Sequence, residues 1–322
     1  MNRAKLAPYI HSTETVYTMH FDLLAALLPL IIVSAVQNGP RVIVMCVLSG
    51  MSAWVVETLG NFAKLRFKPA PFRAAVLGIC MTLLCPVTVP VWMPALGAAA
   101  AALFVRVVLI GNFKNLFMSP AIGWLFLLSF FPKEMMTYPV NRGLVFYPVF
   151  SDITDFSEGW GLARYLQFGE KPPYRMLDIL FGRYPGGMGT TCVLLIFAIT
   201  VYFLIRRSIA WQTSLSMMAT VAVFAALFNR TDASLFYSVV YELSASSLIY
   251  VAIFIAGDLF NAPKLPSARI AFGVLLGAVT LFFRYFGLYE HAVAFALVFV
   301  NLISEALDKM ALSVRLKIKS SM

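Results

Sequence analysis

Long apolar stretches, separated by short polar connections, dominate the chain. A transmembrane helix needs about 20 mostly apolar residues. Ten stretches approach that length, at residues 21–37, 41–62, 72–88, 89–110, 116–132, 190–206, 210–228, 238–260, 268–288 and 291–308. Several are short, and prolines blur the boundary between the third and the fourth. The pattern predicts an all-α, polytopic membrane protein with about ten transmembrane helices, some of them tilted or broken.

One long polar segment, residues 133–189, divides these stretches into five and five. Because five is odd, the second set enters the bilayer from the face opposite the first, as in proteins built from inverted repeats. A proline interrupts an apolar stretch in each half, at Ser119–Pro120 and at Ala262–Pro263. We therefore expect a five-helix half at residues 1–132, a connecting segment at 133–189 and a second five-helix half at 190–322.

Composition and charge agree with a membrane location. Hydrophobic residues make up 61% of the chain and charged residues 12%, whereas a soluble domain has about 45–50% and about 25%. Most Lys and Arg residues fall in the connections on the side that holds both termini, so the positive-inside rule places the termini in the cytoplasm and the connecting segment outside. The short connections on the other side contribute the charges of Arg41, Arg230 and Arg284. The net charge of +10 thus needs no nucleic-acid partner.

A few ionisable groups lie in or near the predicted spans, namely Glu57, Arg106, Glu242, Asp258 and Glu305. Charge in hydrocarbon is costly, so such groups usually face a cavity or a partner. Asp258, together with Ser119, is a candidate for a transport path; for Asp258 a structural ion pair or a helix-end role is the alternative. The four cysteines and three histidines show no metal-binding spacing, and no hydrolase motif is present. We expect no metal site and no catalytic residue.

Glycines mark two further features. The segment RYPGGMGTTC, residues 183–192, leads directly into the sixth span. Exposed backbone amides, a helix start and two threonine hydroxyls together suit an anion; the alternative is a flexible loop before an ordinary helix. The anion site would comprise Gly186, Gly187, Gly189, Thr190 and Thr191. In the ninth span, Gly273 and Gly277 form a GxxxG motif, which favours a helix contact within the chain over a dimer face.

Four blocks of sequence carry a family resemblance. They are APYIHSTETVYTMHFDLLAALLPLIIVSAV, GNFKNLFMSPAIGWLF, PGGMGTTCVLLIFAITVYFLIRRSIAW and IAGDLFNAPKLPSARIAFGVLLGAVTLFFRYFGLYEHAVAFALVFVNLISEALDK. In this order, with ten spans, they resemble the RnfD/NqrB family, the membrane subunits of Rnf complexes and of sodium-pumping NADH:quinone reductase. The likeness is greatest to the RnfD branch. It implies a multi-pass protein of the bacterial inner membrane that works beside other membrane redox subunits.

The chain departs from this family where the family attaches its cofactor. FMN is linked there through its phosphate to the threonine of an S-G-A-T-P-L-A motif. The corresponding residues here are 157–163, and Trp160 occupies the threonine position. Because an indole cannot form a phosphoester, we expect no covalent FMN; the alternative is an alignment shifted by a few residues, which would leave Thr154 as the acceptor. FMN or riboflavin would instead bind noncovalently near Ser157, with Trp160 stacked on its ring and the helix start at Gly186–Thr191 holding a phosphate. The alternative for Trp160 is that it anchors the segment at the bilayer interface.

Three functions follow from these observations. The first is an RnfD-like subunit of an electron-transfer complex, with noncovalently bound flavin and coupled cation transport; it is at most one subunit of a multi-subunit oxidoreductase, because no nucleotide-binding domain is evident. The second is a small-solute transporter or channel on the same fold, without redox activity. The third is a scaffold that assembles redox subunits and holds no cofactor.

Overall fold

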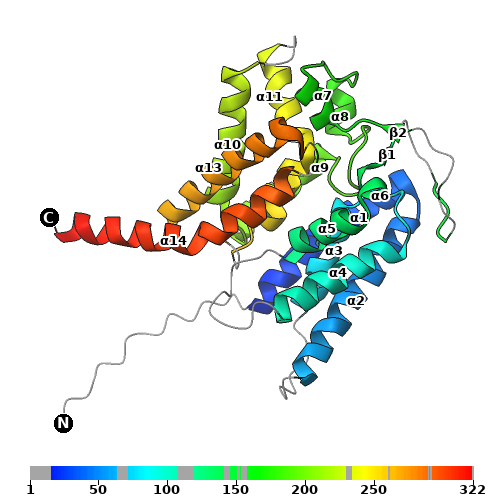
Figure 1. Ribbon diagram of the computed structural model, residues 1–322, viewed down its shortest axis with the longest axis horizontal. Coiled ribbons are helices and arrows are strands. Elements are labelled where there is room, and N and C mark those ends of the chain that lie inside the picture. The colour runs from blue at the N-terminus through cyan, green and yellow to red at the C-terminus, as the bar shows by residue number, and fades with distance from the viewer. Residues whose placement is uncertain are drawn as a thin grey trace.

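In the computed structural model, the described part of the protein comprises residues 16–63, 72–107, 119–140, 146–150, 153, 158–229, 234–259, 262–288, 290 and 292–320. Over these residues the chain is helical apart from turns, extended connections and one pair of two-residue strands (Figure 1). The predicted all-α fold is confirmed. Arg230, Ser157 and Thr154 lie outside the described residues.

Helices lie at all ten predicted stretches. The first half contains α1 (Val16–Asn38), α2 (Arg41–Ala63), α3 (Arg73–Leu84), α4 (Trp92–Val107) and α5 (Ser119–Phe130). The second contains α9 (Val193–Arg206), α10 (Trp211–Leu227), α11 (Leu235–Ser244), α13 (Pro266–Phe283) and α14 (Ala292–Ser320). Within the described residues, four segments are long and apolar enough to cross a membrane, at 18–38, 41–60, 235–255 and 266–287, and five shorter apolar helices accompany them.

The helices of the two halves pack in the same pattern. α2 packs against α3 and α4, and α4 against α5; correspondingly, α10 packs against α11 and α13, and α13 against α14. α5 and α14 meet between the halves, and one apolar core runs through both (Figure 1). This recurrence agrees with a duplicated five-helix unit. The domain limits at residues 132 and 190 stay a prediction.

The GxxxG glycines lie where α13 meets α10. A methyl group at Gly273 would collide with the Thr213 carbonyl oxygen, and one at Gly277 would lie 2.9 Å from the Thr220 side chain. The two glycines therefore let the helix backbones approach closely. The predicted contact within the chain is confirmed.

Two of the apolar stretches are discontinuous. α3 ends at Leu84, and residues 85–91 cross to α4 in an extended and turned conformation. The stretch predicted at 238–260 breaks after α11, where Ser246 and Ser247 have φ angles of 57° and 55°. The break contains the short turn η1 (Ala245–Ser247), and the helix resumes as α12 (Leu248–Tyr250) and η2 (Val251–Ile255). Left-handed backbone costs a non-glycine residue about 1–2 kcal/mol, so surrounding contacts must hold this helix break (residues 244–248) in place.

Two arginines that the sequence placed among loop charges are buried instead. Arg41 is 1% exposed and Arg284 is 0% exposed. Arg41 donates from Nη1 to the Pro148 carbonyl oxygen at 2.9 Å and from Nη2 to that of Val89 at 2.8 Å. Both guanidinium groups therefore satisfy carbonyl oxygens where the backbone leaves helical geometry. Neither residue is therefore a solvated loop charge, and their place on the outer side of the membrane stays a prediction.

The connecting segment is built from short elements and is not a plain loop. It contains α6 (Pro132–Met136), the strands β1 (Tyr138–Pro139) and β2 (Glu158–Gly159), and the helices α7 (Leu162–Phe168) and α8 (Met176–Leu180). The strands pair antiparallel, with Tyr138 opposite Gly159. A small apolar cluster docks the segment on α11; its buried members are Leu162, Ala163, Leu166, Ile179, Tyr184, Tyr241 and Ala245.

Candidate ligand cavity and the helix break that supports it

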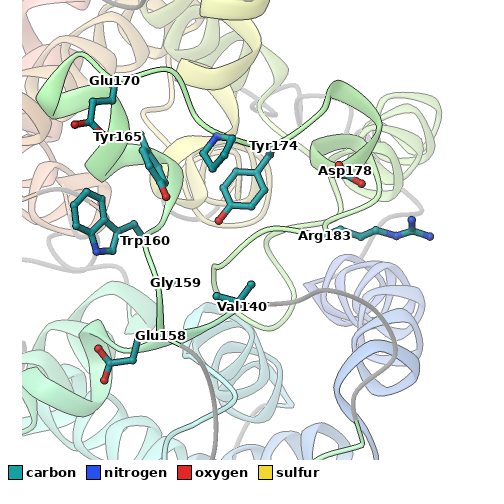
Figure 2. A pocket seen from close by; sticks show the side chains of 10 residues that line it. Val140, Glu158, Gly159, Trp160, Tyr165, Glu170, Tyr174, Asp178 and Arg183 are labelled. Carbon is teal, nitrogen blue, oxygen red and sulfur yellow. The ribbon is translucent and has the colours of Figure 1, made fainter.

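An open cavity of ≈ 770 Å³ lies within the connecting segment (Figure 2). Its lining residues are Val140, Glu158, Gly159, Trp160, Tyr165, Glu170, Pro173, Tyr174, Asp178 and Arg183. Gly159 brings β2 close to the neighbouring loop, because a methyl group there would collide with Pro185. The volume falls in the range of small-molecule sites, which is about 300–1,000 Å³.

Aromatic rings form one wall of this cavity. Figure 2 shows the rings of Trp160, Tyr165 and Tyr174 along it. The Trp160 and Tyr165 centroids are 5.5 Å apart, and those of Tyr165 and Tyr174 are 6.3 Å apart in an edge-to-face arrangement. Trp160 is 40% exposed, and the Arg164 guanidinium lies 4.1 Å from its ring centroid. Arg164 therefore covers one face of the indole, and the Phe168 ring lies 6.2 Å from it, centroid to centroid.

The polar lining is mainly acidic. Glu158, Glu170 and Asp178 contribute carboxylates, and Arg183 contributes the one guanidinium among the lining residues that the structure describes. Asp178 also accepts a hydrogen bond from the Arg175 backbone amide at 3.3 Å, which caps the start of α8. This balance suits a neutral or cationic ring system better than a multiply charged anion.

The described lining contains no serine or threonine that could esterify a phosphate. Trp160, which the resemblance aligns with the threonine of the family's motif, places its indole on this wall. Ser157 lies outside the described residues, so its predicted role stays a prediction. A ligand in this cavity would therefore be held by stacking, shape and hydrogen bonds.

The Gly-rich segment, residues 183–192, packs against the end of α3. The Met188 amide donates to the Cys85 carbonyl oxygen at 3.0 Å, and the Gly189 amide donates to that of Leu83 at 2.9 Å. A methyl group at Gly187 would lie 2.6 Å from the Leu84 carbonyl oxygen. These glycines serve a backbone contact, and the amides of Met188 and Gly189 are occupied, as is that of Thr190, which donates to the Gly187 carbonyl oxygen at 3.2 Å. These three amides of the predicted anion site are therefore already paired within the chain, and an anion there stays a prediction.

The same segment also reaches the helix break. Thr190 Oγ1 accepts a hydrogen bond from Ser247 Oγ at 2.9 Å and donates to the Gly187 carbonyl oxygen at 3.2 Å. The Tyr184 hydroxyl donates to the Ser244 carbonyl oxygen at 3.3 Å, and burial raises the pKa of Tyr184. Thr190 and Thr191 are both buried. The Gly-rich segment therefore joins the two discontinuities, the end of α3 and the helix break.

An arginine and a glutamate complete the polar contacts of the helix break. Arg284 donates from Nη1 to the Glu242 carbonyl oxygen at 2.9 Å and from Nη2 to that of Ala245 at 3.0 Å, and it pairs with the Glu242 carboxylate. Glu290 Oε2 accepts from the Ser246 amide at 3.0 Å. Groups that a continuous helix would pair internally thus find side-chain partners.

Glu290 also binds the connecting segment. Its Oε1 accepts from the Ala163 amide at 2.8 Å, in the first turn of α7. The cap residue of α7, Gly161, has no side chain, and a methyl group there would collide with the Glu290 carboxylate. Burial raises the pKa of Glu290 from its ordinary value of 4.5, and the Ala163 hydrogen bond, the Arg284 charge and the Ser246 hydrogen bond oppose that rise. Sequence reasoning missed Glu290, although it lies inside the fourth block of family resemblance, because nothing in its short connection predicted contacts with α7 and the helix break.

The two transport-path candidates lie elsewhere. Ser119 begins α5. Asp258 follows η2, is partly buried and pairs through its backbone with Ile209, and its carbonyl oxygen accepts from the Ala262 amide at 2.9 Å. Neither residue lines the cavity of the connecting segment. Their role in transport stays a prediction.

Comparison with known proteins decides the family. Residues 3–317 match the NQR2, RnfD, RnfE family. The chain belongs to this family. Among its relatives, the RnfD subunit of the ion-translocating oxidoreductase complex of Actinobacillus succinogenes is 26% identical over 94% of each chain, and the protein of the same description from Haemophilus ducreyi is 25% identical over 94% of this chain and 95% of that one. The corresponding subunit of the proton-translocating ferredoxin:NAD(+) oxidoreductase complex of Clostridium ljungdahlii is 23% identical over 94% of this chain and 92% of its own.

Membership of the NQR2, RnfD, RnfE family confirms the resemblance drawn from the four sequence blocks. It also fits the apolar helices, which make the protein a membrane-embedded one. The likeness extends almost end to end, so the connecting segment and its cavity lie within the matched residues.

Proposed function

We propose that the protein is a membrane subunit of an ion-translocating oxidoreductase complex and that it carries electrons through a noncovalently bound flavin. The family match over residues 3–317 and the relatives that belong to such complexes support the first part. The cavity of the connecting segment supports the second. Other membrane redox subunits would be its partners and would supply the nucleotide and ferredoxin chemistry.

One observation carries the flavin proposal: Trp160 stands on the wall of a ≈ 770 Å³ cavity at the position of the family's attachment threonine. An isoalloxazine ring is planar, and offset stacking on an indole at about 3.5–4 Å gains dispersion energy without a covalent bond. The Tyr165 and Tyr174 rings extend the same wall. The site would thus keep the location of the family's flavin while exchanging its mode of attachment.

Charge supports an orientation with both termini in the cytoplasm and the connecting segment outside. Arg41 and Arg284 are buried and bonded to backbone carbonyls, so they no longer count against the positive-inside rule. Electrons would then be passed near the outer face of the bacterial inner membrane. Coupled cation movement would involve the transport-path candidates Ser119 and Asp258.

The visible spectrum of the purified protein tests this function. We expect absorption of oxidised flavin in detergent, or its recovery when riboflavin or FMN is added, and complete release of the flavin on acid denaturation. Trp160→Ala should weaken flavin binding at least tenfold, whereas Trp211→Ala, which removes an indole that is 50% exposed on α10, should leave it unchanged.

Two outcomes would overturn the proposal. A flavin that stays on the denatured polypeptide would show covalent attachment elsewhere. A protein that remains colourless with both flavins, and that admits solutes into liposomes, would favour the transporter alternative.

A further inference from the structure

A single carboxylate joins the connecting segment to the helix break. Glu290 lies between α13 and α14 and is partly buried. One of its oxygens accepts from the Ala163 amide in α7 and the other from the Ser246 amide in the break, at 2.8 Å and 3.0 Å. Because α7 and the break are far apart in sequence, this side chain holds together two segments that the local backbone does not connect.

Only the ionised form of Glu290 satisfies this arrangement fully. A carboxylate has acceptor sites on both oxygens and makes charge-assisted hydrogen bonds, which are about twice as strong as neutral ones. A proton on one oxygen turns that atom into a donor, and it then faces a backbone N–H. Protonation therefore weakens the bond to Ala163 or the bond to Ser246, and removes the charge from both.

The surroundings offer room for this change. A small cavity reaches Glu290, Ser246 and Ser247 and is otherwise lined mainly by apolar side chains of α3, α5, η2 and α14. It admits the centre of about one water molecule (≈ 10 Å³). A water there would accept the new O–H. Burial favours the neutral acid and raises the Glu290 pKa, so the proton would bind at a higher pH than to an exposed carboxyl.

We propose that Glu290 is a proton-binding site, and that protonation there loosens α7, and with it Trp160, from the helix break. Trp160 precedes Ala163 by three residues, and Arg164, the next residue, covers the indole. A change at the Ala163 amide therefore reaches both partners of that contact. The inference builds on the proposed function, because Trp160 lies at the proposed flavin site, but it requires no bound flavin.

Other titrating groups near Glu290 can be separated from it. The charged neighbours are Arg284 and its ion-pair partner Glu242. Tyr138 and Tyr184 also face it, and burial raises the pKa of each above 10, so both stay neutral over the working range. Its chain neighbour His291 lies outside the described residues, and because histidine is the side chain that ordinarily changes charge between about pH 5 and pH 8, His291→Gln belongs among the controls.

The test uses the flavin-free protein in detergent. The difference in tryptophan fluorescence between the unchanged protein and Trp160→Phe isolates the signal of Trp160, followed between about pH 4 and pH 9. We expect one transition, retained in Glu305→Gln, an exposed carboxylate on α14, and in His291→Gln. Glu290→Gln presents one acceptor and one donor, like the neutral acid, and should hold the low-pH signal throughout. A transition that persists in Glu290→Gln, or none in the unchanged protein, would overturn the proposal.

A second measurement needs no substitution, in case Glu290→Gln does not fold. Hydrogen exchange, corrected for the intrinsic pH dependence, should show protection at Ala163 or Ser246 falling about tenfold on protonation, as expected for loss of one charge-assisted hydrogen bond. The amides of α10 should keep the same protection from exchange on protonation of Glu290. Uniform behaviour of all these amides would contradict the proposal. Because no flavin is present in these two measurements, a negative result in them leaves the proposed function standing. Failure of the protein to bind flavin would likewise leave the proton-binding proposal standing.

Discussion

Arg284 and Glu242 form an ion pair in the protein interior, with side chains that are 0% and 3% exposed. The pair is not isolated, because the same guanidinium donates to the carbonyl oxygens of Glu242 and Ala245, and the Tyr285 hydroxyl donates to the same carboxylate. It therefore fixes the end of α11 and the start of the helix break together. In a low-dielectric interior, the charges are tolerated because each finds several partners.

Removing either charge of this pair should destabilise the protein strongly. Arg284→Met removes the cationic partner of the buried Glu242 carboxylate, which keeps only the Tyr285 hydroxyl of the two, and it removes the guanidinium donor from the Glu242 carbonyl oxygen. We expect a loss of about 3–5 kcal/mol in unfolding free energy. Glu242→Leu combined with Arg284→Met should recover only part of it, because the carbonyl oxygen of residue 242 still lacks the Arg284 donor. Thermal unfolding in detergent measures both.

The control for these variants is Arg206→Met. Arg206 pairs with Asp22, but its side chain is 49% exposed, so its loss should cost only about 1 kcal/mol. If Arg284→Met unfolds at the same temperature as Arg206→Met, the buried pair does not hold the break.

The hydrophobic pattern predicted the position of every span, because apolar length is set by the bilayer and is written directly in the sequence. It did not locate the break in the eighth span. The residues SASS at 244–247 lie inside a continuous apolar run, and the left-handed geometry of Ser246 and Ser247 depends on partners far away in sequence. One of these, Thr190, was singled out for a different role, as an anion ligand.

Charge counting could not show which arginines are buried, for a related reason. It assigns a charge to a side of the membrane from its position along the chain, and so it could not distinguish a solvated arginine from Arg41 or Arg284, whose partners are carbonyl oxygens. Trp160 is the opposite case: the motif alone indicated its importance, and the structure places it on a cavity wall. Glu290 lies inside a block of family resemblance but was not singled out there, and only the folded contacts reveal it.

Gly187→Ala should destabilise the junction between the Gly-rich segment and α3. The added methyl group would lie 2.6 Å from the Leu84 carbonyl oxygen, which is backbone and cannot move aside cheaply. We expect a cost of about 1–3 kcal/mol, measured by thermal unfolding. Gly50→Ala, on α2, is the matched control. Its methyl group would meet its nearest neighbours, on α3, at 3.4 Å or more, so the change should be neutral or slightly stabilising. Equal effects of the two substitutions would contradict the packing described here.

If flavin binds in the cavity of the connecting segment, riboflavin should bind more tightly than FMN. Glu158, Glu170 and Asp178 repel a phosphate dianion, and Arg183 offsets only part of that repulsion. We expect the ratio of the FMN dissociation constant to the riboflavin dissociation constant to fall as salt screens the charges, and to rise in Arg183→Ala. Quenching of flavin fluorescence gives both constants, and Phe150→Ala, an exposed aromatic that does not line the cavity, is the control. Tighter binding of FMN would place its phosphate outside this acidic lining.

Glu290 should make the protein less stable as the pH rises. Its folded-state pKa lies above the ordinary value of 4.5, so between these two values the folded protein holds the proton while the unfolded chain has released it. Stability then falls with increasing pH across that window, by at most about 1.4 kcal/mol per pH unit for one proton, and is flat on either side. Other carboxylates contribute slopes of their own, and the quantity to measure is therefore the difference in unfolding free energy between the unchanged protein and Glu290→Gln. As the pH is raised above 4.5, the unchanged protein should lose unfolding free energy relative to Glu290→Gln. A difference that is constant, or that shifts the other way, would mean that the hydrogen bonds from Ala163 and Ser246 outweigh burial and keep Glu290 ionised.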